Sequence, residues 1–96
     1  MSIVALVDSG ADATLIPATY LRQIGAIPSD EKWLQGVVGE RQIVELYPVA
    51  LQIGNFALYT SVVGDEYGSE AMIGRNVLSH YRIILDGPAT VVEISQ

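Results

Sequence analysis

Residues 5–11 read Ala-Leu-Val-Asp-Ser-Gly-Ala and constrain this chain more than any other segment. The apolar residues before Asp8 favour a buried strand. Gly10 allows a tight backbone turn and removes a side chain that would block close approach. We therefore expect Asp8 at the end of a strand, in a nearly dry setting where a carboxylate becomes chemically useful.

A second segment, residues 71–78, reads Ala-Met-Ile-Gly-Arg-Asn-Val-Leu. Asp-Ser-Gly alone occurs in many ordinary turns, but the order of the two segments and the length between them are specific. On both segments the chain resembles the retropepsins, the small dimeric aspartic peptidases related to those of retroviruses. The similarity runs from about Ile3 to about Leu85.

The resemblance implies a mostly β fold. We expect a retropepsin-like, closed β-barrel-like domain with one or two short helices, residues 1–96 forming one domain and each chain supplying half of a site. Retropepsins usually have one or two strands before the strand that carries the catalytic Asp, whereas seven residues precede Asp8 here. The chain can be a truncated or processed product, another chain can replace the missing strands, or the dimer can form mainly through the C-terminal hairpin. We favour the last, with the strand from Thr90 to Ile94 at the interface.

Composition excludes several classes of protein. The 96 residues contain no Cys and one His, so disulfides, thiolate metal sites and a His-rich metal cluster are excluded. The net charge of −6 argues against nucleic acid and anionic membranes as partners. No apolar run approaches the ~20 residues of a membrane span, and we expect no signal peptide before Asp8. We expect a cytoplasmic protein, or a fragment of a longer one.

Apolar periodicity and turn residues predict the other elements. They are a strand over 3–7, a strand over 13–16, a helix from Pro17 to Gly25, a polar connection over 29–32, a hairpin with arms over 33–39 and 42–53, a strand over 56–62, a polar loop over 64–70, a strand over 71–73, a short helix over 75–80, and a terminal hairpin over 82–85 and 90–94. The long arm changes its apolar phase between Leu46 and Val49, which predicts a bulge or bend near Pro48. Gly54-Asn55 is a two-residue turn signal.

The resemblance also implies the roles of individual residues. Asp8 would be catalytic, Ser9 would brace the loops of two subunits, and Gly10 would offer its carbonyl to the substrate backbone. Ala11 and Asp12 would contact substrate, and Asp12 would form a directional, bidentate ion pair with Arg75. The remaining expected substrate contacts are Gly36, Val37, Val38 and Gly39 in a flap, with Val63 and Ile73 in side pockets. Gly74, Arg75 and Asn76 would support the site.

One Asp-Ser-Gly per chain implies a symmetric homodimer, because this route of peptide hydrolysis needs two carboxylates around one water. We expect an aspartic endopeptidase acting on extended, apolar-containing peptide segments, with no metal or organic cofactor. Two alternatives stay open. The chain can be a catalytically silent retropepsin-fold module for peptide binding or dimerisation, or an interaction domain in which residues 8–10 form only a turn.

Overall fold

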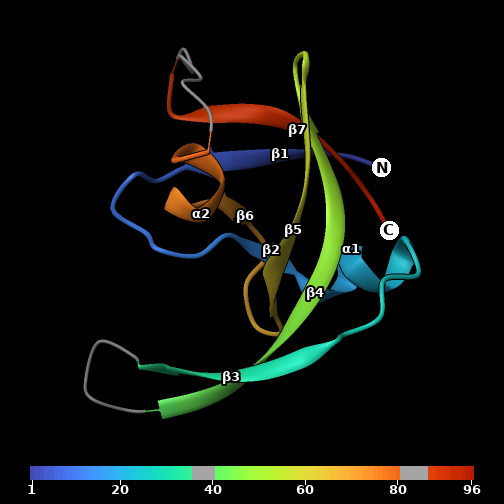
Figure 1. Cartoon of the computed structure of the whole chain (residues 1–96), viewed down its shortest axis with the longest axis vertical. Coiled ribbons are helices and arrows are strands. Elements are labelled where there is room, and N and C mark those ends of the chain that lie inside the picture. Colours follow the sequence, from blue (N-terminus) through green and yellow to red (C-terminus); the bar gives the residue numbers. More distant parts are fainter. Residues whose placement is uncertain (36–40, 81–86) are drawn as a thin grey trace.

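The computed structural model describes residues 1–35, 41–80 and 87–96. The strands in these residues are β1 (Ser2–Val7), β2 (Leu15–Pro17), β3 (Asp30–Gln35), β4 (Arg41–Ile53), β5 (Phe56–Asp65), β6 (Ala71–Ile73) and β7 (Ala89–Ser95). The helices are α1 (Ala18–Gln23) and α2 (Arg75–Leu78), as Figure 1 shows. Neither helix is long and apolar enough to cross a membrane.

The strands close into a barrel. Their order is β3-β4-β5-β2-β6-β1-β7, and β7 also pairs with β4, which joins the two sides of the sheet. Six strands therefore form the closed barrel, and β3 extends it as an arm along the free part of β4 (Figure 1). Most pairs are antiparallel, but β1 pairs with β6, and β2 with β5, in parallel. The expected mostly β, retropepsin-like fold with short helices is confirmed.

The core fills the inside of this barrel. Alternate residues of β1, Ile3 and Ala5, are buried, while Val4 and Leu6 are exposed, as a strand with one buried face requires. The largest fully buried side chains include Ile16, Leu21, Leu51, Ile73 and Ile94, which come from strands on all sides and from α1.

The C-terminal strand supplies a neighbour for β1. β7 runs antiparallel to β1 from Leu6↔Ala89 to Ser2↔Glu93, while β6 occupies the other edge of β1. The strand leading to Asp8 is thus interior to the sheet although few residues precede it. β7 also pairs with β4 from Gln52↔Glu93 to Ala50↔Ser95.

Two expectations for the middle of the chain are wrong. The polar connection expected over 29–32 is mostly strand, because β3 begins at Asp30 and pairs with β4 in one unbroken register. Of the bulge or bend expected near Pro48, the bulge is absent, since β4 pairs with β5 in one register from Leu46 to Ile53. On the opposite edge of β4, the pairing with β3 stops at Leu46 and the pairing with β7 starts at Ala50. Pro48 therefore lies between the two partner strands on that edge. A residue without an amide hydrogen is tolerated best at such a place.

Other boundaries shift by a few residues. Pro17 ends β2 and caps α1 rather than opening the helix. β5 continues to Asp65, so the polar loop before β6 is shorter than expected, and α2 ends at Leu78 with a turn at residues 79 and 80. The Gly54-Asn55 turn is confirmed, with a positive φ of 58° at Gly54. The arm expected over 82–85 lies outside the described residues.

Candidate active site

Asp8 follows directly on β1 and is held by backbone contacts. Its own N–H donates to the Ile73 carbonyl at 3.0 Å, which continues the pairing with β6. One of its carboxylate oxygens, Oδ1, accepts from the Gly10 N–H at 2.9 Å. A Cβ at Gly10 would lie 3.2 Å from the same oxygen, so the absent side chain leaves room for the carboxylate. The carboxylate is therefore oriented by the turn that follows it.

The surroundings of Asp8 differ from the expected nearly dry setting. Asp8, Ser9 and Gly10 are all exposed in the single chain, and the Ser9 hydroxyl makes no hydrogen bond to the described residues. The loop that follows β1 projects beyond the end of the sheet (Figure 1). The described residues of this one chain therefore do not give Asp8 a dry environment.

The loop after Asp8 is fastened to the start of α2 through main-chain atoms. The Arg75 N–H donates to the Ala11 carbonyl at 2.7 Å, and the Asn76 N–H donates to the Asp12 carbonyl at 3.2 Å. Gly74 makes this approach possible, because a Cβ there would collide with the Ala13 carbonyl. The expected supporting role of residues 74–76 thus has a geometric basis in the backbone of both segments.

Sequence reasoning overlooked Thr14, which connects the same two segments. Its side chain is completely buried. The hydroxyl accepts from the Gly74 N–H at 3.0 Å and donates to Asn76 Oδ1 at 2.7 Å. Asn76 in turn donates from Nδ2 to the Ser61 carbonyl of β5 at 3.4 Å. The one available signal was a hydroxyl residue placed among apolar ones in residues 13–16, where a buried polar group needs partners.

The ion pair between Asp12 and Arg75 is present, but its form corrects the expectation. It joins one guanidinium nitrogen, Nη2, to one carboxylate oxygen, Oδ1, so it is not bidentate. The two side chains are 87% and 56% exposed, respectively. Exposed pairs typically contribute only ~0–1 kcal/mol. The buried Thr14 hydroxyl and the backbone contacts, rather than this pair, hold the loop against α2.

An apolar row crosses the outer side of the sheet beside Asp8. Strand pairing aligns Leu6 with Met72, Met72 with Leu15, Leu15 with Val63, and Val63 with Leu46. Residues paired across neighbouring strands point to the same face. The row therefore begins two residues before Asp8 and runs across four further strands to β4.

This row also corrects one expected substrate contact. Ile73 points to the opposite side of β6 from Met72 and is fully buried in the core. Substrate cannot reach it in this structure. Met72, which is partly exposed, occupies the adjacent position on the outer face. The prediction misjudged which face of the short strand β6 points outward, and a three-residue strand gives little periodicity from which to tell.

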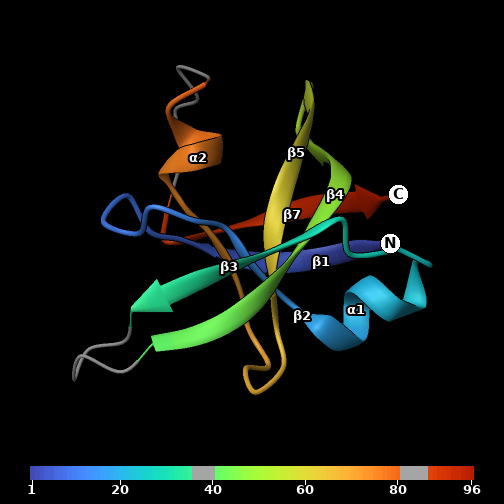
Figure 2. The same ribbon diagram turned by 60° about the horizontal axis from the view of Figure 1, so that its bottom comes forward.

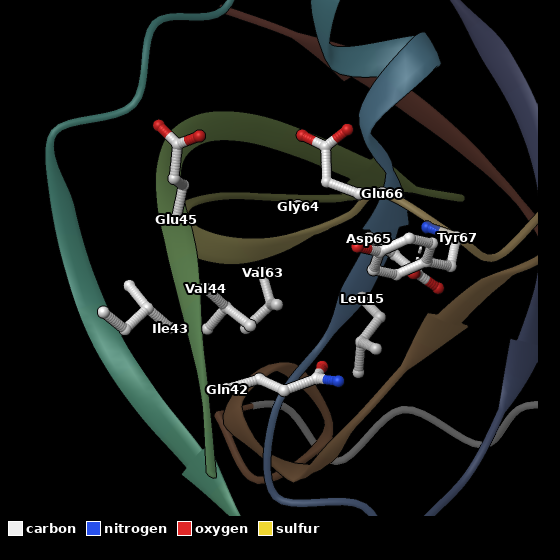
Figure 3. Close-up of a pocket in the computed structure, with 10 residues that line it drawn as sticks. All are labelled: Leu15, Gln42, Ile43, Val44, Glu45, Val63, Gly64, Asp65, Glu66 and Tyr67. Atoms are coloured by element: carbon white, nitrogen blue, oxygen red, sulfur yellow. Dashed lines mark hydrogen bonds between the residues drawn. The ribbon is translucent and has the colours of Figure 1, made fainter.

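A pocket of ≈ 160 Å³ lies at the far end of the row, between β4 and the β2–β5 pair (Figure 3). Its lining consists of Leu15, Gln42, Ile43, Val44, Glu45, Val63, Gly64, Asp65, Glu66 and Tyr67. Val63, an expected substrate contact, is among these residues. No local sequence pattern predicts this pocket, because three separate segments form it.

The expected flap residues, Gly36 to Gly39, lie outside the described residues. The two strands that lead to them, β3 and β4, form the hairpin arm of the barrel. In both overall views, the end of this arm where β3 stops and β4 begins lies on the same side of the barrel as the loop that follows β1 (Figures 1 and 2).

The predicted interface strand has a different environment from the one expected. Val92 and Ile94 of β7 are buried in the core, and Glu93 pairs with strands on both sides. These residues are engaged within the barrel. Val91, which is 59% exposed, points outward opposite Val4, which is 68% exposed.

A closed, mostly antiparallel barrel whose Asp-Ser-Gly loop is fastened to a Gly-Arg-Asn helix start defines a retropepsin-like domain. The chain belongs to the family described as gag-polyprotein putative aspartyl protease, whose sequence profile matches residues 1–80. That match covers both motif segments and supports a protease role. A search of curated proteins found no match. Among the described residues, no group of three or more His, Cys, Asp or Glu side chains is placed to hold a metal ion.

Proposed function

We propose that this chain is an aspartic endopeptidase that acts as a symmetric homodimer with Asp8 of each copy at the shared centre. The observation that carries the proposal is the Asp8 carboxylate, which β1 delivers to an exposed loop and the Gly10 amide orients at 2.9 Å. Family membership supports the protease role. The pairing of two Asp8 residues is our inference from the single motif.

The chemistry follows from two carboxylates that hold one proton between them. The ionised carboxylate takes a proton from a water molecule while the protonated one donates to the oxygen of the scissile carbonyl. The water oxygen bonds to the carbonyl carbon. The C–N bond then breaks, and the leaving nitrogen takes up a proton, so that a carboxylic acid and an amine result. A second copy covering the exposed loop would also supply the low-dielectric setting that the single chain lacks.

Two features of the outer surface support a second copy and a peptide substrate. Val4 and Val91 face each other on paired strands and are largely exposed, so covering them would add apolar burial to a dimer contact. The row from Leu6 to Leu46 offers an apolar floor beside Asp8. Such a floor suits an extended peptide that adds to a sheet as a further strand.

Cleavage of an unbiased peptide mixture, comparing the wild type with Asp8→Asn, tests the proposal. Both proteins are first sized in solution and checked for folding by circular dichroism. We expect cleavage by a wild-type dimer and none by a folded Asp8→Asn dimer. Equal cleavage by both proteins would refute the role of Asp8. A folded wild-type dimer that binds peptides without cleaving them would instead indicate the silent binding module.

A further inference from the structure

The pocket at the end of the apolar row has apolar walls on three strands. Leu15 of β2, Val44 of β4 and Val63 of β5 line it (Figure 3). Because side chains alternate along a strand, the β4 side chain directed into the pocket is that of Val44 rather than Ile43 or Glu45. The volume is ≈ 160 Å³, and an apolar cavity of about 150 Å³ takes up one benzene molecule. The pocket therefore has the size and the lining that suit one apolar ring.

An aromatic residue stands at the edge of this pocket. Tyr67, in the loop between β5 and β6, lines the pocket, and Figure 3 shows its ring on the side away from β4. The residue is 92% exposed, so the described part of the chain leaves almost all of it in contact with water. A ligand that fills the pocket would gain the Tyr67 ring as a further apolar contact surface.

The loop that carries Tyr67 is held by its neighbours on both sides. Asp65 Oδ1 accepts hydrogen bonds from the backbone N–H groups of Tyr67 and Gly68, at 3.0 and 2.8 Å. Both carboxylate oxygens of Glu66 accept from Arg22 Nη2 of α1, at 2.9 and 2.7 Å. The loop is therefore ordered before any ligand arrives, and a ligand that contacts Tyr67 does not have to order its backbone.

We propose that this pocket selects an aromatic side chain, such as phenylalanine, of the peptide substrate, with Tyr67 as the specificity-determining residue. The substrate ring would enter between Leu15, Val44 and Val63 and meet the Tyr67 ring. Aromatic rings in edge-to-face or offset geometry attract each other beyond the effect of the area that they bury, and a saturated side chain of equal size lacks this attraction. The inference rests on the proposed function, since it assigns the pocket to the bound peptide.

Strand pairing indicates how far the pocket lies from the proposed cleavage point. Leu15 pairs with Met72 of β6, which pairs with Leu6 of β1. The pocket is therefore two strand spacings, roughly 10 Å, from the strand that leads to Asp8. An extended peptide covers about 3.3 Å per residue, so a side chain within about four residues of the scissile bond can reach the pocket.

The test uses decapeptides of one cleavable sequence in which phenylalanine, cyclohexylalanine or leucine is placed in turn at each position around the scissile bond. Cyclohexylalanine keeps the size of phenylalanine without its aromatic ring. The proteins are the wild type, Tyr67→Leu, Tyr67→Phe, which keeps the ring, and Tyr59→Leu. The last is a matched control, because Tyr59 is 82% exposed and lies outside the pocket lining.

Binding of the same peptides is measured by calorimetry with Asp8→Asn and with the double variant Asp8→Asn, Tyr67→Leu. These two proteins differ only at Tyr67. Recognition of the peptide is therefore measured separately from turnover.

At one position we expect the wild type to prefer phenylalanine to cyclohexylalanine. The ratio of the two kcat/KM values should fall about fivefold in Tyr67→Leu, equivalent to about 1 kcal/mol at 1.4 kcal/mol per tenfold, and stay unchanged in Tyr67→Phe and Tyr59→Leu. Equal ratios in wild type and Tyr67→Leu would overturn the inference, as would an equal fall in Tyr59→Leu.

The binding measurements distinguish this inference from the proposed catalysis. If no peptide is cleaved but Asp8→Asn binds the phenylalanine peptide more tightly than the cyclohexylalanine peptide, and the double variant does not, the catalysis fails and the pocket assignment stands. If neither cleavage nor binding shows a preference that depends on Tyr67, the pocket assignment is wrong.

Discussion

Gly74 is the residue whose replacement should most disturb the candidate site. In Gly74→Ala the new Cβ meets the Ala13 carbonyl, which is backbone and cannot rotate away. We expect a loss of unfolding free energy of about 3 kcal/mol or more, within the range of severe single substitutions, together with loss of cleavage. Urea denaturation measures the first effect.

Gly54→Ala is the matched control for this substitution. A Cβ at Gly54 meets no atom within 4 Å, and only its positive φ of 58° opposes a side chain. That conformation costs roughly 1–2 kcal/mol. Equal destabilisation by the two substitutions would contradict the view that Gly74 is required for close approach.

Thr14 should contribute through its hydroxyl rather than its shape. Thr14→Val keeps the volume but removes the donor to Asn76 and the acceptor for the Gly74 N–H. We expect a loss of about 1–3 kcal/mol of unfolding free energy, the usual cost of leaving buried polar groups unsatisfied. Thr14→Ser, which restores the hydroxyl, should recover most of it. A Thr14→Val protein as stable as the wild type would show that these hydrogen bonds contribute little.

Individual residues were predictable where a local rule governs them. Asp8 and Gly10 follow from an apolar strand leading into a tight turn, and their geometry agrees with that rule. The role of Thr14 was not predicted, because its hydrogen-bond partners lie 60 and 62 positions away in sequence. Ile73 was assigned to the wrong face because three residues of strand do not reveal which side is covered.

The contact between β1 and β7 should respond to acid through Glu93. The Ser2 hydroxyl donates to the Glu93 carboxylate and, with the Met1 amino group, holds the pKa of Glu93 below its ordinary value of 4.5. A lowered pKa stabilises the folded state at pH values above 4.5, and this contribution is lost as the pH falls through the folded-state pKa. In Ser2→Ala, NMR titration should find the Glu93 pKa shifted upward. An unchanged titration would exclude the hydroxyl as the main cause.

At the level of elements, the prediction succeeded for strands with strong local signals and failed where polar composition concealed a strand. β6 and the Gly54-Asn55 turn appear where apolar runs and turn residues placed them. β3 begins in Asp-Glu-Lys, which reads as a loop, and becomes a strand because β4 offers a partner along its whole length. The phase change near Pro48 reflects a change of partner strand on one edge of β4, and no bulge is needed.

For the whole molecule, the proposed dimer makes a quantitative prediction about mixed subunits. If each site needs Asp8 from both copies, a dimer containing one Asp8→Asn subunit is inactive. With equal amounts of wild-type and variant chains, and free exchange, the activity per wild-type chain should fall to roughly half, because about half of these chains pair with a variant. Mixing the two proteins and measuring cleavage tests this. An unchanged activity per wild-type chain would show that each chain works alone.

The position of β7 was the largest feature of the fold that the sequence did not reveal. Its apolar and polar residues alternate as in any strand with one covered face. No pattern in the local sequence indicates that β7 lies between β1 and β4. The expectation of a C-terminal dimer strand came from asking what could replace strands before β1. In the barrel, β7 of the same chain already lies beside β1.

The position of β1 between β6 and β7 affects when the domain can fold during synthesis. β1 is synthesised before the other strands described here, yet its neighbours β6 and β7 come much later in the sequence, and Ser2 meets Glu93 across 91 positions. Contacts so distant in sequence form late, after the intervening loop has closed. A growing polypeptide therefore carries Asp8 long before the surrounding framework exists. If Asp8 is catalytic as proposed, an unfinished chain would have no means of cutting itself or its neighbours.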